Sequence, residues 1–285
     1  IILYVSLLIF FKDELILKIF CLGILSVGIL SDINKISSPK KRIIIQFCLV
    51  SLFVFFSEIN LQDLRVDYFN NMLSNKFISI TFTIFCILIL INGTNFLDGL
   101  NTLVIGYYIL VITIIILATY KFDLILNHNI FFLLLFLCII YFFNLLEKFY
   151  LGDSGSYLLA FVVGFFILDF FNKNNDISPY FISLLLWYPA FENLFSILRR
   201  ASFSKKFYKP DQSHLHQIIF NFFVKKKFFY KKQTNSLTAN LINFFNALVF
   251  FIFYKYLYET NVMVIIIILN IIFYLSIYFL IRKKA

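Results

Sequence analysis

Long apolar runs separated by short polar segments dominate this sequence of 285 residues. Several runs approach the roughly 20 residues that a helix needs to cross a bilayer. A soluble fold could not cover this much apolar surface, because 61% of the residues are hydrophobic. The pattern predicts an all-α, polytopic transmembrane helical bundle. We expect about ten spans, at residues 1–11, 15–30, 43–56, 78–92, 103–120, 130–146, 157–171, 180–194, 238–257 and 262–281.

The spans are expected to form one integral membrane domain over residues 1–285, with one large polar loop at 195–237. The sequence begins at Ile1, inside an apolar run. We therefore expect the first span to be truncated and one more span to precede it.

Basic residues are distributed unevenly between two alternating sets of loops. Most of the 25 Lys and Arg residues fall at 31–42, 195–237 and 282–284. The positive-inside rule places these segments on the cytoplasmic side. Membrane topology thus accounts for the net charge of +10, and we expect no nucleic-acid partner. The four cysteines lie in apolar runs without metal-type spacing, which is typical of small hydrophobic side chains.

The first cytoplasmic loop places Asp32 at the end of one span and Lys41 near the start of the next. Ser38 and Pro39 are typical of a helix start, as cap and first helical residue. A helix N-terminus that carries basic side chains favours a phosphate. The alternative is that the basic residues only set the membrane topology and that Ser38 only caps the helix.

The second loop gathers Asn92, Asn95, Asp98 and Asn101 at a span terminus. Such oxygen-rich side chains suit a hard cation or a nucleotide. The alternative is capping of the next helix by Asp98 or Asn101. Capping needs one of these residues and not four, so the pattern favours a functional site.

The third loop reads Gly152-Asp153-Ser154-Gly155-Ser156, in which two glycines flank an acid. A carboxylate here can bind Mg²⁺ together with substrate phosphate oxygens. A turn and helix cap is the alternative interpretation.

The last loop contains His214 and His216, two residues apart. This spacing suits an extended segment or loop that faces a phosphate. A zinc site is not indicated, because no cysteine lies near. The Lys-rich and aromatic stretch that follows, up to residue 237, is typical of an interfacial segment.

Taken in order, the four loops resemble the motifs of the polyprenyl-phosphate N-acetylhexosamine-1-phosphate transferases, glycosyltransferase family 4. The acidic pair followed by Ser-Pro-Lys/Arg is similar to residues 31–42, and Asn-x-x-Asn-x-x-Asp-Gly-Leu is similar to 92–100. Gly-Asp-x-Gly-Ser appears at 152–156 and His-x-His at 214–216. Four ordered motifs make an accidental match improbable.

The resemblance implies a Mg²⁺-dependent enzyme, with Mn²⁺ as an alternative ion, in the bacterial inner (plasma) membrane. It would transfer an N-acetylhexosamine-1-phosphate from a UDP-N-acetylhexosamine to undecaprenyl or another polyprenyl phosphate on the cytoplasmic face. UMP would leave, and a lipid-linked cell-envelope glycan, such as a lipopolysaccharide O-antigen, would begin. The roles implied are catalytic for Asp32, Asp98 and Asp153, metal-binding for Asn95 and Asp153, and substrate-binding for Lys41, Asn92, Asn101, His214 and His216.

The sequence departs from the family pattern at three positions. Ser31 stands where the family has the first acid of its pair, and Gln217 stands at the third position of the family's histidine motif. The family's acid after the proline of the preceding span is replaced, and here Pro189 is followed by Glu192. These departures keep a catalytically silent relative open as the second hypothesis. A membrane transporter is the third, and a homodimer stays open.

Overall fold

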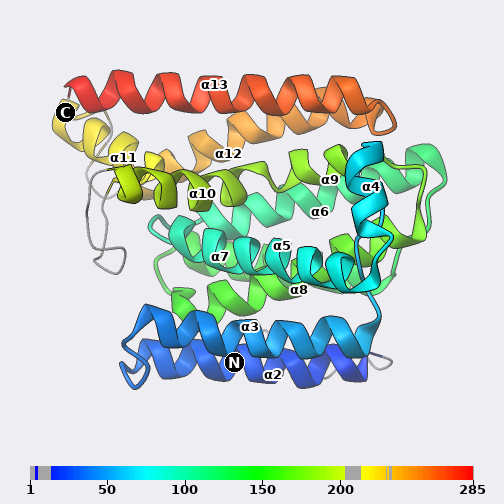
Figure 1. Ribbon diagram of the computed structural model, residues 1–285. Coiled ribbons are helices and arrows are strands. Elements are labelled where there is room, and N and C mark those ends of the chain that lie inside the picture. Colours follow the sequence, from blue (N-terminus) through cyan, green and yellow to red (C-terminus); the bar gives the residue numbers. More distant parts are fainter. Residues whose placement is uncertain (1–3, 6–13, 203–212, 229, 231–232, 285) are drawn as a thin grey trace.

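The chain is all-helical over the residues that the computed structural model describes, which are 4–5, 14–202, 213–228, 230 and 233–284. No strand occurs among them, so the predicted fold class is confirmed (Figure 1). The helices are α2 (Leu15–Asp32), α3 (Pro39–Ser57), α4 (Asp67–Leu73), α5 (Lys76–Leu97), α6 (Leu103–Phe122), α7 (Asn129–Leu145), α8 (Gly152–Lys173), α9 (Pro179–Leu185), α10 (Trp187–Ser202), α11 (Leu215–Lys226), α12 (Thr234–Phe253), η1 (Tyr254–Tyr256) and α13 (Thr260–Lys284).

Six of the described helices are long and apolar enough to cross a membrane, namely α2, α5, α6, α8, α12 and α13. The pair α9 and α10 adds a seventh span if its bend of 76° is taken as a break within one span. The expected count of about ten is therefore not confirmed. α3 carries three basic residues in its first turn and α7 has only 17 residues, while most of 1–11 lies outside the described residues.

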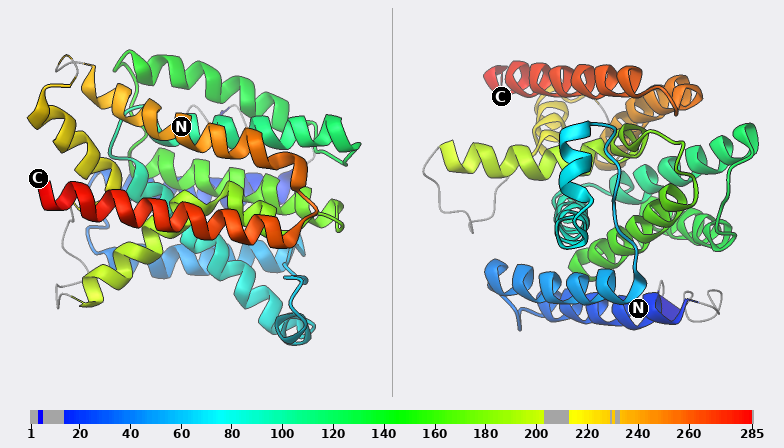
Figure 2. Two further views of the ribbon diagram at one scale, coloured as in Figure 1. Left: turned by 90° about the horizontal axis from the view of Figure 1, so that it is seen from above. Right: turned by 45° about the vertical axis from the view of Figure 1, so that its right-hand side comes forward.

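Helix α8 lies in the middle of the bundle, and 83% of the residues in its 18-residue apolar stretch are buried. It packs against α2 and α5, and α6 packs against α7 and α12. In Figure 1 and in the right-hand view of Figure 2, α13 lies along one side and α2 with α3 along the opposite side. An apolar helix at the centre is covered by protein, whereas α13 exposes its apolar side chains, which suits contact with lipid.

Alternation of the helices brings the predicted cytoplasmic loops to one end of the bundle. Hydrogen bonds there join the ends of α2 and α5 to the start of α8, and the end of α7 to the α5–α6 connection. At the other end, Arg65 Nη1 donates to the carbonyl of Tyr258 over 2.8 Å. The segment 195–237, expected as a loop, is in part helical, because α10 continues to Ser202 and α11 spans Leu215–Lys226.

Candidate functional site

Asp32 caps the N-terminus of α8. Its Oδ1 accepts the backbone N–H of Asp153 over 2.9 Å, and its Oδ2 accepts that of Ser154 over 3.1 Å. Gly152 has a φ of 62°, which glycine adopts readily, and a Cβ there would lie 3.1 Å from the Asp32 carboxylate. A carboxylate at a helix N-terminus satisfies free N–H groups and the helix dipole. Asp32 therefore fixes the backbone that carries Asp153.

Side chains from three other helices, α2, α3 and α5, converge on the Asp153 carboxylate. Its Oδ2 accepts from Ser31 Oγ over 2.5 Å and from Arg42 Nη1 over 2.6 Å. Its Oδ1 accepts from Asn95 Nδ2 over 2.7 Å. Arg42 Nη1 also donates to Ser31 Oγ over 2.7 Å. Ser31, in the position of the family's first acid, thus contacts the central carboxylate directly.

Asp98 lies half-buried, directly after the last residue of α5. Desolvation raises its pKa to about 7, and the negative charges of Asp153 and Asp32 add to the effect. A backbone hydrogen bond from Gly152 acts in the opposite direction. Helix α6 has Thr102 as its N-cap, without a side-chain cap bond. Capping of α6 by Asp98 or Asn101, the alternative interpretation, is therefore not seen.

His214 directly precedes α11 and is held by a buried carboxylate. Its Nδ1 lies 2.9 Å from Glu192 Oε1, and Glu192 Oε2 accepts from the Tyr274 hydroxyl over 2.7 Å. The imidazole also lies against the ring of Phe96, with 5.2 Å between centroids. The backbone of His214 is extended, as expected, but α11 begins at the next residue. His216 therefore lies in a helix and not in an extended segment.

His216 lies behind His214, with 0% of its surface exposed. Its ring stacks on that of His214, and a Cβ on Gly99 would lie 2.7 Å from its Nε2. Within the described part of the chain, neither ring nitrogen of His216 has a hydrogen-bond partner. Burial lowers its pKa from 6.5 to about 4. His216 is thus neutral at physiological pH.

A cleft of about 770 Å³ opens beside these groups. Its polar part includes charged and amide side chains from four helices and their connections, among them Arg42, Asn95, Asp98, Asp153, Arg200 and His214. Its apolar part is formed by spanning helix α5 and its neighbours and includes Ile43, Phe85, Leu88, Ile89 and Ile197. One cleft therefore combines a charged region with a hydrocarbon-like wall.

The structure brings most, but not all, of the predicted site residues into this cleft. The lining includes Asn92, Asn95, Asp98, Asp153 and His214. Four others, Asp32, Lys41, Asn101 and His216, do not line it.

Each of these four has a definite place. Lys41 is exposed, Asp32 caps α8, and His216 packs behind Gly99. The backbone of Asn101 is bound to Asn235.

Arg42, Glu192 and Arg200 are side chains at the site that the sequence did not single out as site residues. Arg42 belongs to a basic run of three residues, in which nothing distinguished it from Lys41. Glu192 was noted only as a departure from the family pattern. A signal existed for Glu192, since a charged residue inside an apolar helix needs a partner.

The described residues contain no group of three or more His, Cys, Asp and Glu side chains that could hold a metal ion. Asp153 and the amide oxygen of Asn95 could together supply two oxygen ligands if the amide turned over. Mg²⁺ commonly takes one or two carboxylates and completes its shell with water and substrate phosphate. The donor set therefore fits an ion shared with a substrate and does not fit a closed protein site.

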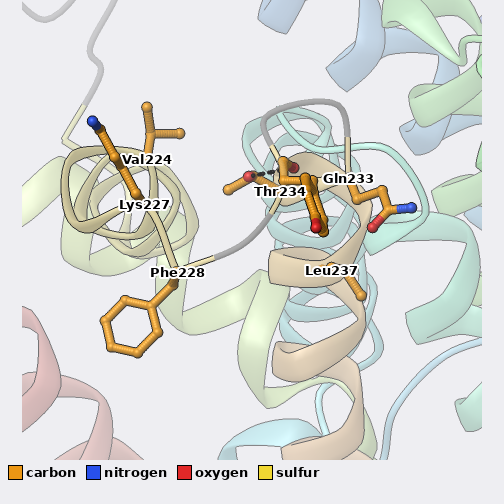
Figure 3. A pocket seen from close by; sticks show the side chains of 7 residues that line it. Val224, Lys227, Phe228, Gln233, Thr234 and Leu237 are labelled. Atoms are coloured by element: carbon orange, nitrogen blue, oxygen red, sulfur yellow. Dashed lines mark hydrogen bonds between the residues drawn. The ribbon is translucent and has the colours of Figure 1, made fainter.

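A second hollow, of about 680 Å³, lies between the end of α11 and the start of α12 (Figure 3). Among the described residues its lining includes Lys227, Phe228, Gln233 and Leu237, and none of the described lining residues is an acid. The cleft beside Asp153 is lined by two acids and a histidine, so we place the candidate site there.

The fold and the cleft define a helical membrane protein with an acid-rich site at one end of its bundle. The sequence profile of the family described as Glycosyl transferase family 4 matches residues 15–171, which is more than half of the chain. The chain belongs to this family, as the resemblance of its motifs implied, and the family indicates a membrane glycosyl-1-phosphate transferase. No curated protein matches the sequence. The histidine segment lies outside the matched residues.

Proposed function

We propose that this protein transfers an N-acetylhexosamine-1-phosphate from a UDP-sugar to undecaprenyl or another polyprenyl phosphate, at the cytoplasmic edge of the membrane. The observation that carries the proposal is the double character of the cleft. Arg42, Asp98, Asp153 and His214 form its polar part, and apolar side chains such as Phe85 line the rest. Such a cleft suits one substrate that enters from lipid and one that enters from water.

In the proposed reaction an oxygen of the lipid phosphate attacks the phosphorus that carries the sugar. The bond from that phosphorus to the oxygen of UMP breaks, and UMP leaves with the electron pair. The second pKa of a phosphate monoester is about 6, so much of the nucleophile is already doubly anionic at neutral pH. A strong general base is therefore dispensable, which makes the serine at position 31 compatible with activity.

Repulsion between two anionic phosphates is the main barrier. Arg42 and Arg200 line the cleft and would lower it by electrostatic stabilisation. His214, oriented by Glu192, would leave its Nε2 for a substrate phosphate. Asp98, with a pKa near 7, would hold or release a proton at physiological pH. Asp32 would act through the α8 backbone, by keeping Asp153 in place.

Asp153 and Asn95 would hold Mg²⁺, or Mn²⁺ in its place. The ion would supply positive charge to the phosphate oxygens of both substrates. Arg42, which contacts Asp153 Oδ2, would bring a further positive charge to the substrate phosphates.

A catalytically silent relative is the second candidate. It is favoured by the arrangement around Asp153, where Ser31, Arg42 and Asn95 already occupy both carboxylate oxygens. A chain that satisfies its own central carboxylate in this way could bind a substrate without converting it.

The deciding experiment uses membranes that contain the protein, polyprenyl phosphate and a panel of labelled UDP-N-acetylhexosamines. Label in the lipid fraction and UMP release are measured with Mg²⁺, with Mn²⁺ and with EDTA, and Asp153→Ala serves as the control. Lipid labelling that requires both the divalent ion and Asp153 supports the proposal and names the sugar. Absence of labelling with every sugar, from a protein that unfolds cooperatively, supports the silent relative.

A further inference from the structure

Helix α12 carries four asparagines, at 235, 240, 243 and 246, although it is apolar and long enough to span the membrane. Polar side chains in a spanning helix are costly unless they find partners in the protein. All four asparagine side chains hydrogen-bond to groups outside α12. A general excess of asparagine in the chain does not explain why each of them meets a specific partner.

Three of these side chains reach the connection between α5 and α6, which carries Asp98. Asn235 Oδ1 accepts the backbone N–H of Asn101 over 2.7 Å, and Asn240 Oδ1 accepts from Thr102 Oγ1 over 3.1 Å. Asn243 Nδ2 donates to the carbonyl of Thr102 over 3.2 Å. The connection is therefore bound both at its backbone and at the side chain of Thr102.

Thr102 is the residue that needs this support. It is β-branched, has only 1% of its surface exposed and adopts a φ of 70°, a left-handed conformation that is rare for such residues. Its backbone N–H donates to Asn144 Oδ1 over 2.5 Å, from helix α7. The surrounding amides thus hold the chain in a conformation that Thr102 would not choose alone.

The approach of α12 to this connection depends on a glycine. A Cβ on Gly106, in the first turn of α6, would lie 2.5 Å from Asn243 Nδ2. Asn243 can therefore reach the carbonyls of Thr102 and Leu103 only because position 106 has no side chain.

We propose that α12 is a positioning helix for the candidate site. Asn235 holds the backbone of Asn101, Asn240 and Asn243 hold Thr102 in its left-handed conformation, and these contacts together place Asp98 at the cleft. α12 lies beyond the residues that the family profile matches. That α12 holds the segment in place follows from the contacts described above. That this placement matters for catalysis rests on the proposed function.

The first test is amide hydrogen exchange of the segment 98–103 in the detergent-solubilised protein. Asn235→Leu and Asn243→Leu keep the side-chain size and favour a spanning helix, but they remove the hydrogen bonds. We expect exchange at 98–103 to become about fivefold faster or more, the change that a hydrogen bond of typical net strength would give. Asn246→Leu is the matched control, because Asn246 is buried on the same helix but accepts from the Trp187 indole.

The second test is rescue by glycine, which adopts a positive φ without strain. Asn243→Leu should lower the turnover number more than it raises the KM for the UDP-sugar, and adding Thr102→Gly should recover most of the turnover. A loss caused only by weaker helix packing would not be recovered. Equal exchange in Asn243→Leu and Asn246→Leu, or no rescue, overturns the proposal. If the unaltered protein transfers no sugar phosphate, the proposed function fails, and the exchange result still decides whether α12 holds the segment.

Discussion

Arg42 Nη1 lies 2.6 Å from Asp153 Oδ2, and the two side chains are 22% and 25% exposed. The pair is therefore partly removed from water, where a charge-assisted hydrogen bond is stronger than at an open surface. It joins the first turn of α3 to the first turn of α8. Because both residues line the cleft, the pair places a cation and a carboxylate where two phosphates would meet.

The first prediction separates Arg42 from its neighbour Lys41, which the sequence named as the phosphate contact. Arg42→Gln should lower kcat/KM for sugar-phosphate transfer about tenfold to a hundredfold, because a hydrogen bond to a charged group contributes about 1.5–3 kcal/mol. Lys41→Gln should change it less than about threefold, since Lys41 is exposed and does not line the cleft. Steady-state kinetics of the two variants decide the matter. A larger loss for Lys41→Gln would restore the prediction made from the sequence.

The second prediction concerns Asp32. If it acts by capping α8, Asp32→Asn should cost about 1 kcal/mol of stability, since an amide can accept only one of the two N–H groups well. This corresponds to a fall of about 2–4 °C in the thermal midpoint. The acidic limb of the pH–rate profile should stay in place and turnover should be reduced but not lost. A variant of normal stability without turnover would instead give Asp32 a direct part in proton transfer.

The third prediction is a pH dependence of stability that originates at His216. Its pKa is about 4 in the folded chain and 6.5 ordinarily. Between these values the unfolded chain binds a proton that the folded chain does not, so stability falls as the pH drops from about 6.5 towards 4. The loss between pH 7 and pH 5 should be about 2 kcal/mol.

His216→Phe removes this protonation site and should flatten the dependence of stability on pH. Thermal unfolding in detergent at a series of pH values measures the difference between the two proteins. Parallel curves would show that His216 is protonated in the folded chain.

The sequence predicted the helical class and the elements that carry the site, because apolar periodicity and helix-start signals are local. Ser38 and Pro39 mark the start of α3 as expected, although the Ser38 side chain makes no cap bond. Asn92, Asn95, Asp98 and Asn101 were predicted as one functional group, and the first three line one cleft together with Asp153, which was predicted from another loop. Asn101 does not line it.

What the sequence could not predict depends on contacts between distant segments. The bend between α9 and α10 lies at Leu186, within one apolar run. The choice of Arg42 over Lys41 depends on which face of α3 meets α8. The asparagines of α12 lie about 140 positions from Thr102 along the chain, so no local pattern relates them.

The last prediction concerns Glu192, which is buried and binds both His214 and the Tyr274 hydroxyl. Glu192→Gln keeps the size of the side chain but removes the charge that orients the imidazole. Its turnover should fall about tenfold or more, with little change in thermal stability. Tyr274→Phe is the matched control, because it removes one hydrogen bond to Glu192 and leaves the contact with His214, so its turnover should fall less than about threefold. Kinetics and thermal unfolding of both variants distinguish the two roles of the carboxylate. Equal losses of turnover would mean that Glu192 only stabilises the packing of α10 against α13. A larger loss of turnover for Glu192→Gln means that Glu192 positions His214 for the substrate.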